Sequence, residues 1–149
     1  MSVKVLALGN ILMKDDGVGI EVAKELEGRL NSCGIEVIYG ETNIGYCISK
    51  VRDEDTLFIL DASYFDITPG EVTVLPLEAH TGIKKEITQH SLSFLSLHKH
   101  YFKHLKGLIF AIEAQEITFE TGLSTELKSI LNDIAQNIYD MILEYQHKN

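Results

Sequence analysis

Three acidic side chains lie at points of the sequence where carboxylates could act together. Asp15 and Asp16 are adjacent in GNILMKDDGVG, residues 9–19, which follows an apolar run and precedes an amphipathic one. The apolar run TLFILDA, residues 56–62, stops on Asp61. Carboxylates that are brought together raise each other's pKa unless a cation lies between them. The pattern therefore indicates a site for a divalent metal ion.

His90, in the segment ITQHSLSFLSL, is the best candidate for a third ligand. It lies at a predicted loop-to-helix junction, where a side chain is accessible and is positioned by a rigid element. Two carboxylates and one imidazole with open positions suit zinc, nickel, manganese or iron better than copper(I), which prefers sulfur. His100 and His104 could share a helical face, but they lack the glutamate of an HExxH motif and lie among lysines.

Each of these residues also has an ordinary structural interpretation. An Asp-Asp pair before a helix commonly caps it or interacts with its dipole. An aspartate at the end of a strand is often a turn residue, and a lone histidine is often solvated. The joint placement of three such residues at one edge favours a site over three separate accidents.

Other chemistries fit the sequence less well. The turn has neither GxGxxG nor GK[ST], and two aspartates would repel a phosphate from the backbone amides that bind it. Cys33 and Cys47 have 13 residues between them, which matches neither a CxxC pair nor a zinc knuckle, so we expect free thiols. A nucleophilic Cys47 with His90 as its base remains a minor alternative.

Strands and helices alternate along the chain. Apolar or alternating runs predict strands at 3–8, 35–40, 56–62 and 107–114, and a further one in TPGEVTVLPL, 68–77, which we expect to be antiparallel because its connection is short. Helical periodicity predicts helices over 17–31, from Gly45 to near Arg52, from His90 to about His104, and from the N-cap Ser124 onward.

This order predicts an α/β fold: a three-layer α/β/α sandwich with a mostly parallel central sheet of about five strands and one antiparallel strand. In such sheets the functional site lies at the carboxyl ends of the strands. That rule selects the two acidic positions, Asp15-Asp16 and Asp61, independently of their chemistry.

Length and charge limit the classes of function. We expect residues 1–149 to form one domain, because a chain of this length can bury a single large core. The formal net charge of −9 disfavours nucleic acid and anionic membranes as partners. No apolar run approaches the roughly 20 residues that span a bilayer, and the start MSVKVLALGN does not resemble a signal peptide, so we expect a cytoplasmic protein.

With these motifs in this order, the chain resembles the hydrogenase maturation proteases. These are endopeptidases that trim the C-terminal extension from the large-subunit precursor of nickel-iron hydrogenases. The resemblance covers nearly the whole chain and is carried by VLALGNILMKDDGVG, ILDAS followed by PGEV, TQHSLSFLSL, and GLS at 122–124. One departure is that Glu113 is followed by Ala114, where the family commonly has proline.

The resemblance implies roles for particular residues. The family's metal-ligand triad falls on Asp16, Asp61 and His90, which would be both the metal ligands and the catalytic residues. Asp15 would then cap the helix or orient the site. The turn GETNIGY, 40–46, matches a loop beside the family's site, so Glu41, Thr42 and Gly45 are candidates for substrate contact.

The resemblance also implies a mechanism, in which the metal is nickel supplied by the substrate and the partner is the nickel-loaded large-subunit precursor. Other divalent metals could bind in vitro. Water would attack a peptide bond, with either the metal polarising the carbonyl or a carboxylate acting as general base. A non-catalytic metal-sensing or metal-carrying module, and an enzyme acting on a small anionic metabolite, are the alternatives.

Overall fold

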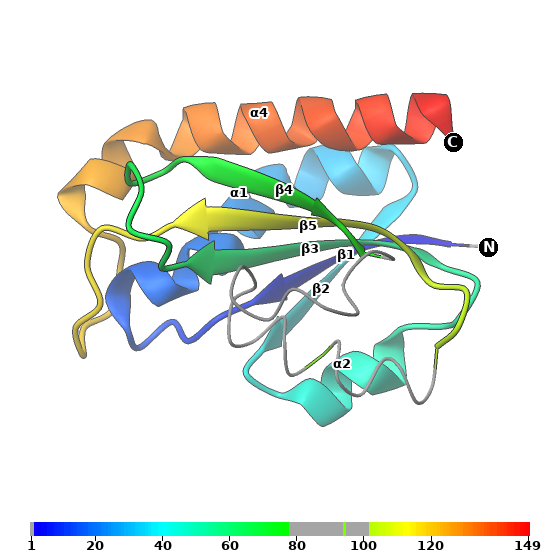
Figure 1. Ribbon diagram of the computed structural model, residues 1–149, viewed down its shortest axis with the longest axis horizontal. Coiled ribbons are helices and arrows are strands. Elements are labelled where there is room, and N and C mark those ends of the chain that lie inside the picture. Colours follow the sequence, from blue (N-terminus) through cyan, green and yellow to red (C-terminus); the bar gives the residue numbers. More distant parts are fainter. Residues whose placement is uncertain (1, 78–93, 95–101) are drawn as a thin grey trace.

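The protein folds around one five-stranded sheet with helices on both faces (Figure 1). The computed structural model describes residues 2–77, 94 and 102–149. The elements in chain order are β1 (Val3–Leu8), the 3-10 helix η1 (Lys14–Gly17), α1 (Val18–Ser32), β2 (Ile35–Glu41), α2 (Ile44–Lys50), β3 (Thr56–Ser63), β4 (Val72–Pro76), β5 (Lys106–Glu113) and α4 (Thr125–Lys148).

The sheet has the strand order β2-β1-β3-β5-β4. The first four of these strands are parallel to one another, and β4 runs antiparallel to β5 at the edge. The predicted fold class is therefore confirmed. β4 is antiparallel as expected, but its short connection to β3 does not form a hairpin, because β5 lies between the two strands.

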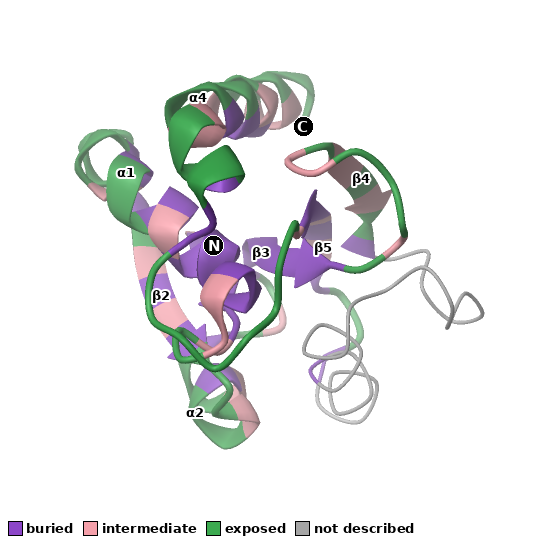
Figure 2. Ribbon diagram, turned by 90° about the vertical axis from the view of Figure 1, so that its left-hand side faces the viewer, coloured by how far each residue is buried: buried purple, intermediate pink, exposed green. Residues whose placement is uncertain are grey.

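Two apolar clusters lie on the two faces of the sheet. Figure 2 shows β3 and β5 coloured largely as buried between the flanking helices. Val5 and Ala7 of β1 belong to the cluster that α1 and α4 cover. Leu6 and Leu8, whose side chains point the other way, belong to the cluster that includes Cys47 of α2. This alternation within a fully apolar strand is typical of a strand buried on both faces. No helix of the described residues is both long and apolar enough to span a bilayer.

The helix expected from His90 to about His104 lies largely outside the described residues. Its described C-terminal part, residues 102–105, is not helical. His104 contacts Asp53 instead: its backbone N–H donates to Asp53 Oδ1 at 2.6 Å, and its ring Nδ1 lies 2.7 Å from Asp53 Oδ2. The expectation of a helix reaching His104 is therefore wrong at that end.

Two glycines allow the chain to close tightly around the carboxyl ends of β1 and β3. Gly9 has φ +136°, and a Cβ there would lie 2.2 Å from the carbonyl oxygen of Asp16. A Cβ on Gly19, in the first turn of α1, would lie 2.5 Å from the Leu60 carbonyl oxygen of β3. Only glycine permits these backbone approaches, which bring η1 and α1 against the end of β3.

We predict opposite effects for two glycine-to-alanine substitutions within α1. Gly19→Ala must push the helix away from β3 and should lower the free energy of unfolding by about 1–3 kcal/mol. Gly28→Ala, on the same helix with no heavy atom within 4 Å of the added Cβ, should raise it by about 0.5–1 kcal/mol. Urea titration measures both values, and a Gly19→Ala protein as stable as the wild type would contradict the close approach.

Candidate functional site

Asp16 is held at the end of β1 by two hydrogen-bond donors. It lies in η1 with 7% of its surface exposed. Its Oδ2 accepts the backbone N–H of Asn10 at 2.8 Å, and its Oδ1 accepts the hydroxyl of Tyr64, which follows β3. These two donors come from different strand ends and hold the carboxylate in one orientation.

Asp61 lies on β3, the central strand of the sheet, and is fully buried. Its Oδ1 accepts the backbone N–H of Ala62 at 2.8 Å. The strand continues for two residues beyond it, to Ser63, so Asp61 stands inside the strand and not at its last residue.

Tyr64, directly after β3, donates its hydroxyl to Asp16. Although 45% of its surface is exposed, the partial burial of its side chain is the main cause that raises its pKa, followed by the hydrogen bond to Asp16 and then by the negative charges of Asp16, Asp61 and Asp15. The hydroxyl therefore stays protonated and remains a donor over the physiological pH range. The hydroxyl contacts Asp16, and the charge of Asp61 also raises its pKa. The sequence analysis missed Tyr64, although a hydroxyl directly after a strand end was a signal for it.

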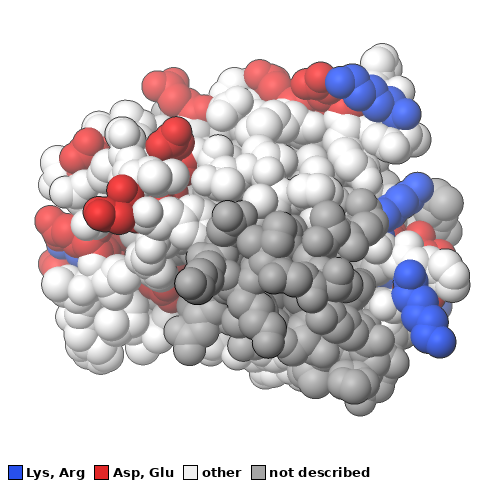
Figure 3. Space-filling model, in the orientation of Figure 1, with Lys and Arg blue, Asp and Glu red and all other residues white. Residues whose placement is uncertain are grey.

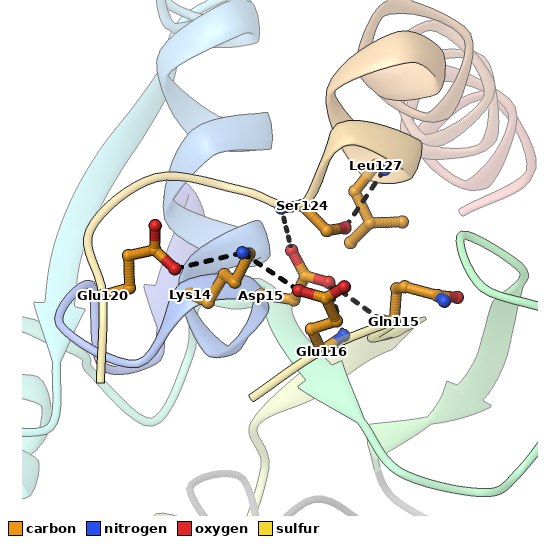
Figure 4. A network of polar contacts seen from close by, with 7 residues as sticks. All are labelled: Lys14, Asp15, Gln115, Glu116, Glu120, Ser124 and Leu127. Atoms are coloured by element: carbon orange, nitrogen blue, oxygen red, sulfur yellow. Dashed lines mark hydrogen bonds and ion pairs between the residues drawn. The ribbon is translucent and has the colours of Figure 1, made fainter. Parts of the chain in front are cut away.

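Asp15 has a different role from its neighbour (Figure 4). Its carboxylate is fully buried and accepts three backbone N–H groups from the segment between β5 and α4. The donors are Gln115 at 2.9 Å and Glu116 at 2.8 Å, both to Oδ2, and Ser124 at 2.7 Å to Oδ1. Asp15 caps neither η1 nor α1, for which no side-chain cap is present. It anchors a distant loop.

Ser124 continues this anchor into α4. It is the N-cap residue of that helix, as predicted, and its Oγ accepts the Leu127 N–H at 3.4 Å. Its own N–H is the donor to Asp15. The start of the last helix is thereby tied to the turn that carries Asp16.

A second buried carboxylate, Glu113 at the end of β5, anchors the loop that carries Tyr64. Its Oε1 accepts the Ser63 hydroxyl at 2.9 Å and the Phe65 N–H at 3.0 Å. Its Oε2 accepts the N–H groups of Asp66 at 3.0 Å and Ile67 at 3.3 Å. Glu113 thus holds Tyr64 within reach of Asp16, a role that the sequence analysis did not assign to it.

The other predicted site residues take no part in these contacts or fall outside the described residues. His90 falls outside the described residues. Glu41, Thr42 and Gly45 are all exposed, and Glu41 has φ +51° at a bulge where β2 ends beside β1. Asn43 between them caps α2 by accepting the Tyr46 N–H at 3.0 Å. Within residues 2–77, 94 and 102–149, no three His, Cys, Asp or Glu side chains are grouped as a metal site requires.

A sequence profile of the hydrogenase maturation proteases matches residues 20–144. The chain belongs to this family. The matched range includes Asp61 and His90 and begins shortly after Asp16. The resemblance that the sequence motifs indicated is confirmed, and this chain is a member of a family of proteases.

Individual relatives agree with this assignment. A protein of Methanocaldococcus jannaschii assigned to the hydrogenase maturation proteases is 27% identical over 141 residues, covering 90% of this chain and 92% of its own length. The hydrogenase expression/formation protein HupD of Thiocapsa roseopersicina is 26% identical over 151 residues, covering 95% of this chain and 66% of its own length.

Two solved structures have the same fold. The [NiFe] hydrogenase maturation protease HybD from Thermococcus kodakarensis superposes with a TM-score of 0.71 at 28% identity, covering 95% of this chain and 99% of that one. The hydrogenase maturating endopeptidase HybD from E. coli superposes with a TM-score of 0.76 at 19% identity, covering 97% and 94%. The second likeness concerns the fold alone.

Cys47 does not fit a nucleophile in this protease. The side chain is fully buried among Leu6, Leu8 and Gly40. Burial raises the pKa of its thiol to about 11, so the thiolate that a cysteine nucleophile needs is disfavoured at neutral pH. Both cysteines are free thiols, as expected.

Alkylation distinguishes the two thiols. At about pH 8 iodoacetamide should modify the exposed Cys33 and leave Cys47 unmodified, because a group with a raised pKa stays protonated until the pH approaches that value. Mass spectrometry of the labelled peptides measures this, and labelling in concentrated urea, where both should react, is the control. Equal rates in the folded protein would contradict the burial of Cys47.

The adjacent aspartates should respond differently to the same substitution. Asp15→Asn places an amide NH₂ against backbone N–H donors and should lower the free energy of unfolding by on the order of 3 kcal/mol. Asp16→Asn keeps an acceptor for Asn10 and can donate to the Tyr64 oxygen, so its change should stay below about 1 kcal/mol. Urea titration of both variants tests this, and equal losses would contradict the separate roles.

Proposed function

We propose that this protein is the endopeptidase that removes the C-terminal extension of a nickel-iron hydrogenase large-subunit precursor after nickel insertion. Family membership supports the protease activity, and the names of the relatives supply the hydrogenase. The observation that carries the proposal is the pair of buried carboxylates, Asp16 in η1 after β1 and Asp61 near the end of β3, with the Tyr64 hydroxyl donating to Asp16.

In this proposal, the nickel belongs to the substrate and the protein contacts it with Asp16, Asp61 and His90. The two carboxylates supply hard oxygen donors and negative charge, which a buried site tolerates best when a cation is bound. The three ligands leave open positions for the precursor's own thiolates. Placement of the scissile peptide bond at the site would therefore depend on the presence of nickel in the precursor.

The Asp16 carboxylate is held in a fixed orientation by hydrogen bonds within the protein. The Asn10 N–H donates to its Oδ2 and the Tyr64 hydroxyl donates to its Oδ1, so the carboxylate is already oriented. Partners of this kind orient a ligand and are worth about 10–100-fold in metal affinity. Glu113 and Asp15 contribute indirectly, because they hold the loops after β3 and β5 in place.

Cleavage then requires water to attack a peptide carbonyl that docking holds close to the metal. Two arrangements are consistent with these side chains: the nickel polarises the carbonyl, or one carboxylate accepts the proton of the attacking water. Glu41, Thr42 and Gly45, exposed after β2, would contact the flanking residues of the precursor.

The test is to incubate the protein with nickel-loaded and nickel-free large-subunit precursor and to weigh the products. We expect loss of a C-terminal peptide from the loaded form only. Asp16→Asn, Asp61→Asn and His90→Ala should each lower the cleavage rate by at least about a hundredfold, while the fold remains intact by circular dichroism.

The matched control is Asp66→Asn, which removes an exposed carboxylate from the loop after β3 and should leave cleavage unchanged. Full activity in all three site variants would refute the triad. Metal-dependent binding of the precursor without shortening would instead indicate a metal-sensing module.

A further inference from the structure

Exposed apolar side chains gather at the end of the molecule that carries Asp16. In the described part of the chain, nine large hydrophobic residues are exposed, and seven of them follow the carboxyl ends of the parallel strands β1, β2, β3 and β5. These seven are Ile11, Leu12, Tyr46, Tyr64, Ile67, Ile117 and Phe119. Single exposed apolar residues are ordinary, but a concentration at one end marks an interaction surface.

Four of these residues form what we call the apolar rim: Ile11, Leu12, Ile117 and Phe119. Phe119 is 82% exposed, the most of the nine, and the others are 39–46% exposed. They belong to two loops, the one after β1 and the one between β5 and α4, that are far apart in the sequence.

The two loops of the apolar rim are joined by backbone hydrogen bonds. The Glu120 N–H donates to the Leu12 carbonyl at 2.9 Å, and the Lys14 N–H donates to the Glu120 carbonyl at 2.8 Å. Lys14 Nζ also pairs with Glu116 at 2.9 Å and Glu120 at 3.1 Å, and Asp15 holds the same loop from inside (Figure 4). The apolar side chains are thus presented on a braced backbone, which lowers the entropy lost on binding.

The apolar rim is continuous with the candidate site. Asn10, which precedes Ile11, donates its N–H to Asp16, and the Asp16 N–H donates to the Met13 carbonyl at 3.0 Å. A ligand that covers the rim therefore lies beside the Asp16 carboxylate.

We propose that the apolar rim docks an apolar segment of the polypeptide whose nickel the site contacts, namely the large-subunit precursor. This inference rests on the proposed function for the identity of the partner. A protein fits the surface better than a small molecule, because the adjoining hollow, lined by Ile11, Lys14 and Gly122 among others, holds only about 140 Å³. Protein interfaces are centred on aromatic and aliphatic side chains of this kind.

Charge disfavours a membrane as the occupant. The net charge is −9, and Glu116 and Glu120 flank the rim residues. Figure 3 shows further acidic side chains toward the end of the molecule at which β3 and β5 terminate, while lysine and arginine appear on this face mainly at the opposite end. An anionic lipid surface would be repelled there, whereas a polypeptide that carries a cationic metal would be attracted.

The experiment separates docking from cutting by using nickel-free precursor, which the proposed function leaves uncut, as the equilibrium probe. The rim variant is Leu12→Ser with Phe119→Ser, which adds no charge. The matched control is Val74→Ser with Leu143→Ser, which replaces the two remaining exposed large hydrophobic residues of the described part of the chain, both away from this edge. Thermal unfolding midpoints verify that all proteins are folded.

We expect the rim variant to raise the Kd for nickel-free precursor about tenfold and the KM for nickel-loaded precursor similarly, with kcat unchanged. The control should leave all three values unchanged. An unaltered Kd in the rim variant, no binding by the wild type, or a wild-type dimer that only the rim substitutions dissociate would overturn the inference. If the wild type binds in a rim-dependent way but never shortens loaded precursor, the docking surface stands and the proposed proteolysis fails.

Discussion

The arrangement of this site depends on one buried carboxylate that the protein uses to accept its own backbone N–H groups. Asp15 lies in the turn after β1 and accepts three N–H groups from the residues between β5 and α4. Ser124 is buried, and a buried donor without a partner is strongly destabilising. The interaction joins the turn of Asp16, the loop of Phe119 and the start of α4 into one body.

A second buried carboxylate, at the end of β5, also accepts backbone N–H groups from a loop. Glu113, at the end of β5, accepts the Ser63 hydroxyl and three N–H groups from the loop after β3, and this loop carries Tyr64 to Asp16. Two acids therefore organise loops, while two others, Asp16 and Asp61, are the candidates for chemistry. All four gather at the carboxyl edge because parallel strands end there together.

Much of the fold followed from periodicity. The continuous apolar runs of β1 and β3 and the four-residue spacing along α1 predicted elements that the structure confirms within one or two residues. The N-cap at Ser124 was predicted because a serine before an apolar helical repeat satisfies a free N–H of the first turn. The partner of β4 was not predicted, because a short connection limits how far a strand can travel but does not show which strand is inserted beside it.

The sequence alone determined the fold class, the edge at which chemistry could occur and the acidic character of that edge, because these depend on hydrophobic pattern and on residue type at strand ends. Only the tertiary structure decided which donors each carboxylate accepts. Asp15 and Asp16 are neighbours with the same side chain, and nothing local distinguishes them. Their difference comes from donors about a hundred residues away for Asp15 and from Tyr64 for Asp16, contacts that exist only once the strands have been brought together.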